Sequence, residues 1–313
     1  MAEKIATREA YGLALKKLGE KNRDVVVLDA DLSKSTKTSE FAKAFPDRFF
    51  NMGIAEQNMI GTAAGLAAAG KIPFASSFAI FACGRAFEQV RNSVAYPRLN
   101  VKIAASHAGL TVGEDGASHQ AIEDIALMRA VPNMTVIVPA DAVETEAAVM
   151  AAAEIDGPVY LRLGRPAVPV IYEQENYQFQ VGRAITLREG KDATVIACGI
   201  MVSVALEAAA QLAEEGLSVR VVNMHTIKPL DREAVRRAAE ETGAVVTAEE
   251  HSIIGGLGSA VAEVLVETCP VPMERVGVRD VFGESGTPAE LMEKYGLTAR
   301  HVADAVRKVV QRK

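Results

Sequence analysis

Short apolar runs alternate with longer segments of helical periodicity along most of the chain. Residues 25–28, 72–78 and 101–105 are apolar-rich runs of strand length, which is typical of strands buried in a parallel sheet. Residues 7–20 and 142–154 carry apolar or small side chains three and four positions apart, which predicts helices with one face toward a core. Strands that alternate with helices predict a parallel sheet covered by helices on both faces.

A second unit of the same kind follows the first. Prolines, mixed polar residues and weak periodicity predict a linker at residues 166–185. The alternation of strand and helix resumes with an apolar run at residues 193–199. The predicted fold class is therefore α/β, with two doubly wound domains at residues 1–165 and 186–313, the second built on a mainly parallel sheet.

Composition and charge exclude some classes of protein. The chain has 313 residues, of which 24% are charged and 49% hydrophobic, as in an ordinary globular protein. Its net charge of −6 argues against nucleic acid as a partner, since that partner would need a basic surface. No apolar run reaches the roughly 18 residues of a membrane span, and the N-terminus lacks a signal-peptide core. Cys83, Cys198 and Cys269 lie far apart, so we predict a cytoplasmic protein without a metal knuckle.

One carboxylate stands at the mouth of a helix of small residues. Glu56 precedes residues 59–70, where alanine and glycine would let a backbone or a flat ligand approach closely. A partly desolvated glutamate at this position would favour its neutral form and could share a proton with a ring nitrogen. The simpler alternative is that Glu56 only stabilises the helix N-terminus through the helix dipole.

Polar and aromatic residues follow the predicted strands, at the edge where open α/β sheets bind ligands. Asp31 and Ser35 lie in the polar loop after the first of these strands, and turn formation or helix capping is the alternative role for both. Phe78 and Phe81 end or follow the predicted strand 72–78, in a chain that is only 5% aromatic. They predict either a wall for a planar ring or an ordinary part of the core.

The densest polar segment is the loop at residues 106–120. It contains His107, His119, Asp115 and three glycines, and it holds two of the five histidines of the chain. Glycines let a loop close over a ligand, and histidines there can transfer protons or bond to hydroxyls. A zinc site is not predicted, because no cysteine or third clustered ligand accompanies the histidines. Arg165, after the last strand of the first unit, is either a phosphate ligand or a solvated loop residue.

A glycine pair in the second unit has only a superficial likeness to a dinucleotide-binding loop. Gly256 and Gly258 form a Gly-x-Gly pattern, but the third glycine and the ribose-binding acid are missing. Tight packing of a turn is therefore the predicted role of these two glycines.

Two motifs resemble the C-terminal half of transketolase, namely Gly-Ile-Ala-Glu-Gln-Asn-Met at residues 53–59 and Val-Gly-Glu-Asp-Gly-Ala-Ser-His-Gln at residues 112–120. The likeness extends through residues 122–126, 132–134, 228–231 and 249–258, so that it covers essentially the whole chain. It implies that the first domain is a pyrimidine-binding domain and the second a transketolase C-terminal domain. It also implies an enzyme of carbohydrate metabolism that uses thiamine diphosphate to move a two-carbon ketol unit between sugar phosphates, as in the pentose phosphate pathway.

The resemblance implies roles for the residues near the cofactor. Glu56 matches the glutamate that bonds N1′ of the aminopyrimidine and promotes the imino form, whose nitrogen removes the proton from the thiazolium C2. Phe78 and Phe81 match the aromatic residues that hold the pyrimidine. A third aromatic residue of the family would fall near Gly84, so the ring wall is expected to be thinner or differently built. Asp31 matches an acidic residue near the cofactor.

The resemblance also implies substrate contacts at His107, Asp115, His119, Arg8, Ser35 and Arg165. The first three match residues that contact sugar hydroxyls, the carbonyl or phosphate, and the two histidines are expected to share the catalytic work with Glu56. The last three match phosphate contacts, with Arg8 resting on the short match Ala6-Thr7-Arg8.

The metal site of the family is missing from this sequence. The Gly-Asp-Gly motif that holds a divalent metal at the diphosphate does not occur, and residues 113–116 belong to the substrate loop. We therefore predict the smaller subunit of a split transketolase. A separate N-terminal subunit would supply the diphosphate site and Mg or Ca, thiamine diphosphate would lie between the chains, and this chain would dimerise within an α2β2 complex.

Two other interpretations stay open. The chain could be a 1-deoxyxylulose-5-phosphate synthase-like or a 2-oxoacid dehydrogenase E1 β-like subunit, although the former usually carries arginine where His107 stands here. It could also be a partner protein without enzymatic activity that has kept the fold. Residues 186–313 are expected to stabilise an interface, because no charged group of residues there rivals the loop at 107–119.

Overall fold

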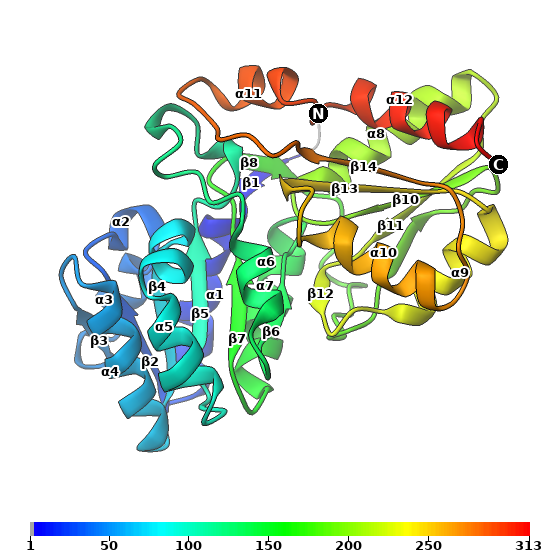
Figure 1. Ribbon diagram of the computed structural model, residues 1–313. Coiled ribbons are helices and arrows are strands. Elements are labelled where there is room, and N and C mark those ends of the chain that lie inside the picture. The colour runs from blue at the N-terminus through cyan, green and yellow to red at the C-terminus, as the bar shows by residue number, and fades with distance from the viewer. Residues whose placement is uncertain (1–2) are drawn as a thin grey trace.

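The computed structural model describes residues 3–313 as two α/β units that lie side by side (Figure 1). The first two residues of the predicted first domain lie outside the described residues. The first unit is built on a seven-stranded sheet in the order β12-β6-β7-β5-β4-β2-β3, parallel except for β12. Its strands are β2 (Val25–Asp29), β3 (Phe49–Asn51), β4 (Ile72–Phe78), β5 (Lys102–Ser106), β6 (Thr135–Ile137), β7 (Val159–Arg162) and β12 (Thr226–Lys228).

Helices cover both faces of this sheet because its strands are apolar on both sides. In β2, Val25 and Val27 pack on the face of α1 and α7, whereas Val26 and Leu28 pack on the face of α4. The helices are α1 (Thr7–Lys21), α2 (Ser33–Thr36), α3 (Ser39–Ala44), α4 (Glu56–Ala68), α5 (Phe87–Gln89), α6 (Asp124–Ala130) and α7 (Ala142–Glu154), with shorter turns η1 (Pro46–Arg48), η2 (Ile80–Arg85), η3 (Val90–Ala95) and η4 (Leu110–Asp115).

The second unit repeats the plan on a five-stranded sheet in the order β14-β13-β10-β11-β9, in which only β9 is antiparallel. Helices α8 and α12 cover one face, and α9 and α10 cover the other. The elements are β9 (Ile185–Arg188), β10 (Ala193–Ala197), α8 (Met201–Glu214), β11 (Val219–Asn223), α9 (Arg232–Thr242), β13 (Val245–Ser252), α10 (Leu257–Glu267), β14 (Met273–Val278), α11 (Pro288–Lys294) and α12 (Ala299–Val310).

The predicted fold class, two doubly wound α/β units, is confirmed. Between β4 and β5 the chain forms a series of wide π-helical turns, η2 and η3, around the short α5. Gly256 and Gly258 serve packing, as expected: a Cβ at Gly256 would overlap the Glu249 carboxylate, and one at Gly258 would press on Arg275.

The two units are joined by more than a linker. Strand β12, which follows β11 of the second unit in sequence, pairs with β6 of the first sheet. The segment predicted as a linker contains β8 (Ala167–Pro169), which pairs antiparallel with β1 (Lys4–Ala6). One hydrophobic cluster runs through both units and includes Val136 from the first with Met224 and Val261 from the second. Within residues 3–313, no helix combines the length and hydrophobicity needed to cross a membrane.

A buried carboxyl group helps to hold the linker segment between the units. Glu144 in α7 accepts hydrogen bonds from the Tyr177 hydroxyl at 2.5 Å, from Asn223 Nδ2 at 2.9 Å and from the Ala140 amide at 2.6 Å. Burial raises the pKa of Glu144 to about 7, although these hydrogen bonds act in the opposite direction.

This pKa predicts a pH dependence of stability that Glu144→Gln removes. Because the folded chain holds the Glu144 proton more tightly than the unfolded chain, its stabilising contribution is complete below about pH 4.5 and is lost as the pH rises through about 7. We expect the variant to gain up to about 3 kcal/mol relative to wild type between about pH 5 and about pH 8. Urea unfolding of both proteins at both pH values measures this change. Any effect of the substitution on the free energy of unfolding that does not depend on pH cancels in the comparison.

The matched control is Glu154→Gln, because Glu154 ends the same helix and is exposed. The difference in free energy of unfolding between this control variant and wild type should be the same at both pH values. An equal pH dependence in Glu144→Gln and wild type would show that Glu144 is ionised in the folded chain throughout this range.

Candidate active site

Most of the predicted site residues lie where the parallel strands of the first sheet end. Phe78 is the last residue of β4, His107 follows β5, and Arg165 follows β7. Since β4, β5 and β7 are neighbours in the sheet, these three residues from distant segments come to one edge. Asp31 and Ser35 follow β2, on the other side of β4. This is the edge at which open α/β sheets bind ligands.

Glu56 is the first residue of α4, and it is only 1% exposed. Its Oε2 accepts a hydrogen bond from Arg85 Nη1 at 2.7 Å, while Oε1 lies 3.4 Å from the Ser77 hydroxyl. A buried carboxylate needs such a partner, because an unpaired charge away from water is costly. Glu56 is thus buried at the start of α4, and its carboxylate is paired with an arginine.

Two phenylalanines and two histidines form an aromatic cluster at this edge. The Phe78 ring stacks on the His107 imidazole, with centroids 3.8 Å apart, and lies nearly parallel to the Phe81 ring at 6.1 Å. His119 meets both phenylalanines edge-on, at 5.3 Å from Phe81 and 6.2 Å from Phe78. The loop at 106–120 thus brings both of its histidines to the aromatic residues that the sequence singled out.

His107 is neutral at physiological pH. Its pKa falls to about 3, mainly because the imidazole is buried and in addition because Arg8, Arg165 and His119 lie near it. Its Nδ1 shares a hydrogen bond of 2.9 Å with the Ser106 hydroxyl. A neutral imidazole can donate at one ring nitrogen and accept at the other, which suits it to bind a hydroxyl or a carbonyl group.

The predicted phosphate contacts come together from three distant segments. Arg8 in α1 donates from Nη1 to the Ser35 carbonyl at 2.8 Å and from Nε to the Arg165 carbonyl at 3.2 Å. The Arg165 guanidinium donates to the exposed Glu114 carboxylate at 2.8 Å and to the Val112 carbonyl. Burial lowers the pKa of Arg8, yet a guanidinium stays charged in proteins. Two cations therefore stand together in a chain whose net charge is −6.

The two predicted acidic contacts are exposed. Asp115 lies at the tip of the 106–120 loop, and Asp31 accepts a hydrogen bond from Asn51 Nδ2 at 2.9 Å. The loop that carries Asp31 is held by its buried neighbour Asp29, which accepts from the Thr36 hydroxyl at 2.7 Å. Burial raises the pKa of Asp29. The cofactor and substrate roles of Asp31 and Asp115 stay predictions.

Sequence reasoning gave no role to Arg85. Its guanidinium carbon lies 4.4 Å from the centroid of the Phe81 ring, a cation–π contact, and the same guanidinium pairs with Glu56. At the position where the family places a third aromatic residue, Gly84 is exposed, and the neighbouring Arg85 covers Phe81. The available signal was the spacing of four residues between Phe81 and Arg85, which is a same-face spacing in a helix.

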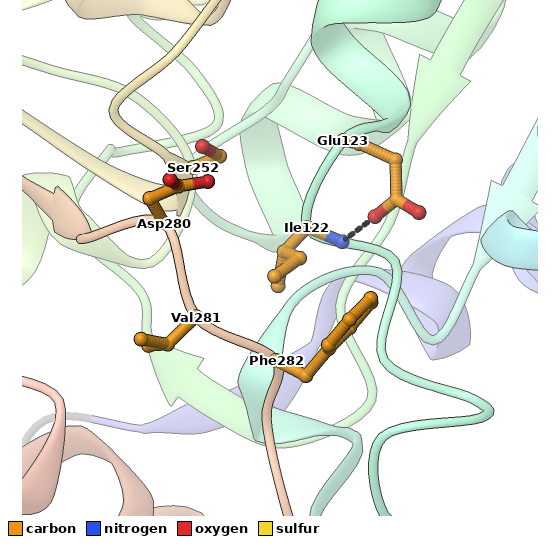
Figure 2. A pocket seen from close by; sticks show the side chains of 6 residues that line it. All are labelled: Ile122, Glu123, Ser252, Asp280, Val281 and Phe282. Carbon is orange, nitrogen blue, oxygen red and sulfur yellow. Dashed lines mark hydrogen bonds between the residues drawn. The ribbon is translucent and has the colours of Figure 1, made fainter.

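A pocket of about 260 Å³ at the junction of the units contains none of the predicted site residues (Figure 2). It is lined by Ile122, Glu123, Ser252, Asp280, Val281 and Phe282. The Glu123 carboxylate turns back to accept the Ile122 amide at 2.8 Å. Because titratable groups converge at the strand ends instead, the aromatic and arginine clusters there form the candidate site. Among residues 3–313, no group of three or more His, Cys, Asp or Glu side chains is placed to hold a metal ion.

Family models identify both α/β units. The pyrimidine-binding domain of transketolase matches residues 3–170, and the transketolase C-terminal domain matches residues 182–302. The chain therefore belongs to the transketolase family, as the motifs at 53–59 and 112–120 predicted.

Some relatives match this chain over nearly their whole length, and others over about half of it. A 6-deoxy-6-sulfo-D-fructose transketolase subunit of a Clostridium species is 50% identical over 98% of this chain and 95% of its own length. Transketolase of Mus musculus is 42% identical over 99% of this chain but over only 50% of its own length. A solved structure described as a split gene transketolase, inactive β4 tetramer, is 65% identical, covers 99% of both chains and superposes with a TM-score of 0.93.

The ion pair between Arg85 and Glu56 yields a prediction about stability. Arg85→Met leaves the buried carboxylate without its cation, so we expect a loss of about 1–2 kcal/mol at neutral pH, limited because Arg85 is half exposed. Denaturant unfolding at neutral pH measures this loss.

Arg91→Met is the control, because Arg91 is an exposed arginine of the same segment whose side chain bonds to Asn92. It should change stability by less than about 0.5 kcal/mol. An equally small effect of Arg85→Met would mean that the ion pair with Glu56 contributes little to stability.

Proposed function

We propose that this chain is one subunit of a divided transketolase. Together with a separate N-terminal subunit, it uses thiamine diphosphate to transfer a two-carbon ketol unit between sugar phosphates. The observation that carries the proposal is the buried Glu56 carboxylate next to stacked aromatic rings at the strand ends. The relatives support it, because one is a transketolase subunit of similar length and the mouse enzyme is matched over half its length.

The residues present suit the pyrimidine end of the cofactor. Phe78 and Phe81 are inclined by only 14° to each other and offer apolar ring faces. Glu56 keeps one carboxylate oxygen, Oε1, whose nearest polar contact is a long one to Ser77. We assign Asp31 as a further cofactor contact at the same edge. Once bound, thiamine diphosphate would supply the carbon nucleophile and the electron sink of the reaction.

We propose that Mg or Ca and the diphosphate are held mainly by the partner subunit. The sequence of this chain lacks the Gly-Asp-Gly motif that serves this purpose in the family. The division of labour would give this chain the pyrimidine ring and the sugar, and the partner the charged tail of the cofactor.

The side chains at the strand ends would handle protons and orientation. Glu56 would hold a proton at a pyrimidine nitrogen and take it back, which requires that Arg85 yield part of its ion pair. Phe78 and the buried His107 would keep water from one side of the reacting carbon, since both are under 8% exposed. His107 and His119 would bond to the sugar carbonyl and hydroxyls and pass protons to them.

The arginine cluster would bind the phosphate of the sugar. Arg8 and Arg165 bring two guanidinium groups beside the Ser35 carbonyl, and a guanidinium can bind phosphate through two parallel hydrogen bonds. A phosphate at Arg165 would displace Glu114, at little cost because exposed ion pairs are weak. Asp115, at the loop tip, would contact a sugar hydroxyl.

The substrates and the assembly are also proposals. The first substrates to test are xylulose 5-phosphate and ribose 5-phosphate, followed by sulfonated and other ketoses, since the Clostridium relative carries the name of a sulfosugar. We further propose that the chain forms a homodimer within an α2β2 complex and works in the cytoplasm. A protein 65% identical to it is described as an inactive β4 tetramer, which supports self-association of such chains.

Reconstitution tests the proposed function. Purified chain is mixed with an N-terminal transketolase subunit, thiamine diphosphate and Mg²⁺, and ketol transfer is measured with the two pentose phosphates. We expect transfer by the pair and none by either chain alone. Full transfer by this chain alone would contradict the division of labour, whereas decarboxylation of pyruvate by the pair would favour the related synthase or dehydrogenase reaction.

The carboxyl group at position 56 is tested in the same pair. Glu56→Gln keeps the shape of the side chain but cannot release and recover a proton, so turnover should fall by about 100-fold or more. Glu154→Gln, far from the strand ends at the exposed end of α7, should retain wild-type turnover. Unchanged turnover in Glu56→Gln would show that this chain acts only as a scaffold in the complex.

A further inference from the structure

The loop at 106–120 is buried at its base and exposed at its tip. Residues 107–113 are buried, whereas Glu114, Asp115 and Ser118 are exposed and His119 is half-buried. The base lies against the second unit, whose segment 279–288 runs past η4 into α11. The conformation of the loop is thus set by residues that follow it by well over one hundred positions.

Glu250 in β13 holds the near end of the loop. Its Oε1 accepts the Thr111 amide at 2.5 Å, and its carbonyl accepts Arg162 Nη2 at 2.9 Å. The carboxyl group lies directly on Gly109, where φ is +84° and where an added Cβ would overlap it. Glycine is therefore required at 109 both for the left-handed backbone and for the approach of Glu250.

The far end of the loop is held by the segment before α11. Gln120 Nε2 donates to the Glu284 carbonyl at 2.9 Å and to the Leu110 carbonyl at 3.1 Å. Gly116 packs on Ser285. The second unit therefore clamps the loop on both sides of the exposed tip that carries Asp115 and precedes His119.

A third contact fixes the residues just after the loop. The Ser252 amide donates to the Ile122 carbonyl at 2.7 Å, and Figure 2 shows the segment Asp280–Phe282 facing Ile122 and Glu123 across the pocket. The chain that leaves the loop is consequently bonded to the same strand, β13, that carries Glu250.

We infer that the second unit positions the substrate loop and that Glu250 is a positioning residue for His107 and His119. The inference rests on the proposed function for the identity of the substrate, but the ordering of the loop can be measured without it. This inference adds a direct role to the interface role expected for residues 186–313: they shape the substrate side of the site. Thiamine-binding residues such as Glu56 lie on α4 and do not depend on this contact.

The chain offers a matched control beside Glu250. Glu249 is its neighbour in β13, is equally buried and also bonds to backbone amides, those of Leu257 and Gly258, both at 2.7 Å. Those amides open α10, away from the loop. Loss of Glu249 should therefore disturb the second unit without releasing residues 109–120.

The experiment compares Glu250→Met, Glu250→Gln and Glu249→Met in the reconstituted complex. Methionine keeps the volume but removes the acceptor, whereas glutamine retains an acceptor oxygen for Thr111. For Glu250→Met we expect a KM for the sugar phosphate raised by about tenfold, a smaller change in kcat and an unchanged Kd for thiamine diphosphate. Glu250→Gln should stay within about threefold of wild type, and Glu249→Met should keep the wild-type KM.

Hydrogen exchange of the full chain supplies a readout that does not need activity. Peptides covering 109–120 should exchange at least about tenfold faster in Glu250→Met, and peptides covering 257–260 should do so in Glu249→Met. If Glu250→Met fails to fold, Gln120→Leu tests the same clamp from its far end and should raise exchange over 113–120.

The outcomes separate the two proposals. An equal rise of KM in Glu249→Met, or faster loop exchange with an unchanged KM in Glu250→Met, would overturn the positioning role of Glu250. If the wild-type pair shows no ketol transfer, the proposed function fails, and the exchange of 109–120 still decides whether the second unit orders the loop.

Discussion

The buried ion pair between Arg162 and Asp124 is the constraint on which the junction of the two units depends. Arg162 ends β7, Asp124 begins α6, and the guanidinium donates from Nε to Asp124 Oδ2 at 2.7 Å. Burial alone would raise the pKa of Asp124, but Arg162 and other nearby donors lower it overall. A buried pair is tolerated only when every remaining polar atom finds a partner. The Tyr160 hydroxyl and the Glu250 carbonyl supply two such partners, and the bond to Glu250 ties the second unit to the strand ends.

The cost of burying charged groups also explains why positive charge is distributed unevenly at the site. His107 is neutral because its ring is buried against Phe78, so the positive charge at the edge comes from Arg8 and Arg165. The neutral His107 and the two arginines are thus distinct groups at this edge of the sheet, which suits the proposed binding of a sugar phosphate. In an acidic chain, only such local cations can attract an anionic substrate.

Sequence patterns predicted the parts of the fold that are governed by local periodicity. The strand at 72–78 and the helix at 142–154 have their predicted bounds, because a fully buried strand and an alanine-rich helix each leave an unbroken pattern. The π-helical turns of residues 80–95 leave no such pattern, since they keep helical spacing only approximately. The clustering of Phe78 with His107 followed from the rule that parallel strands end at one edge.

What the sequence could not predict were partners that lie far along the chain. Arg85 carries no sign that it pairs with Glu56, and Glu250 was known only as part of a motif, with no hint that its carboxylate reaches Thr111, 139 positions away. Such contacts depend on how one unit packs on the other. Local periodicity carries no information about this packing. Buried carboxylates without a local partner are nevertheless informative, because burial obliges them to have a distant one.

The way the units are joined bears on how a transketolase can be divided between chains. Strand β12 belongs to the first sheet although it follows β11 in sequence, and one hydrophobic cluster passes through both units. Cutting between them would expose a sheet edge and part of this core, together with the buried Arg162 network. A division on the N-terminal side of both units leaves these contacts intact. The loop at 106–120 and the β13 strand that holds it would then always be made on the same polypeptide, so that the proposed sugar side of the site would be assembled before the proposed partner binds.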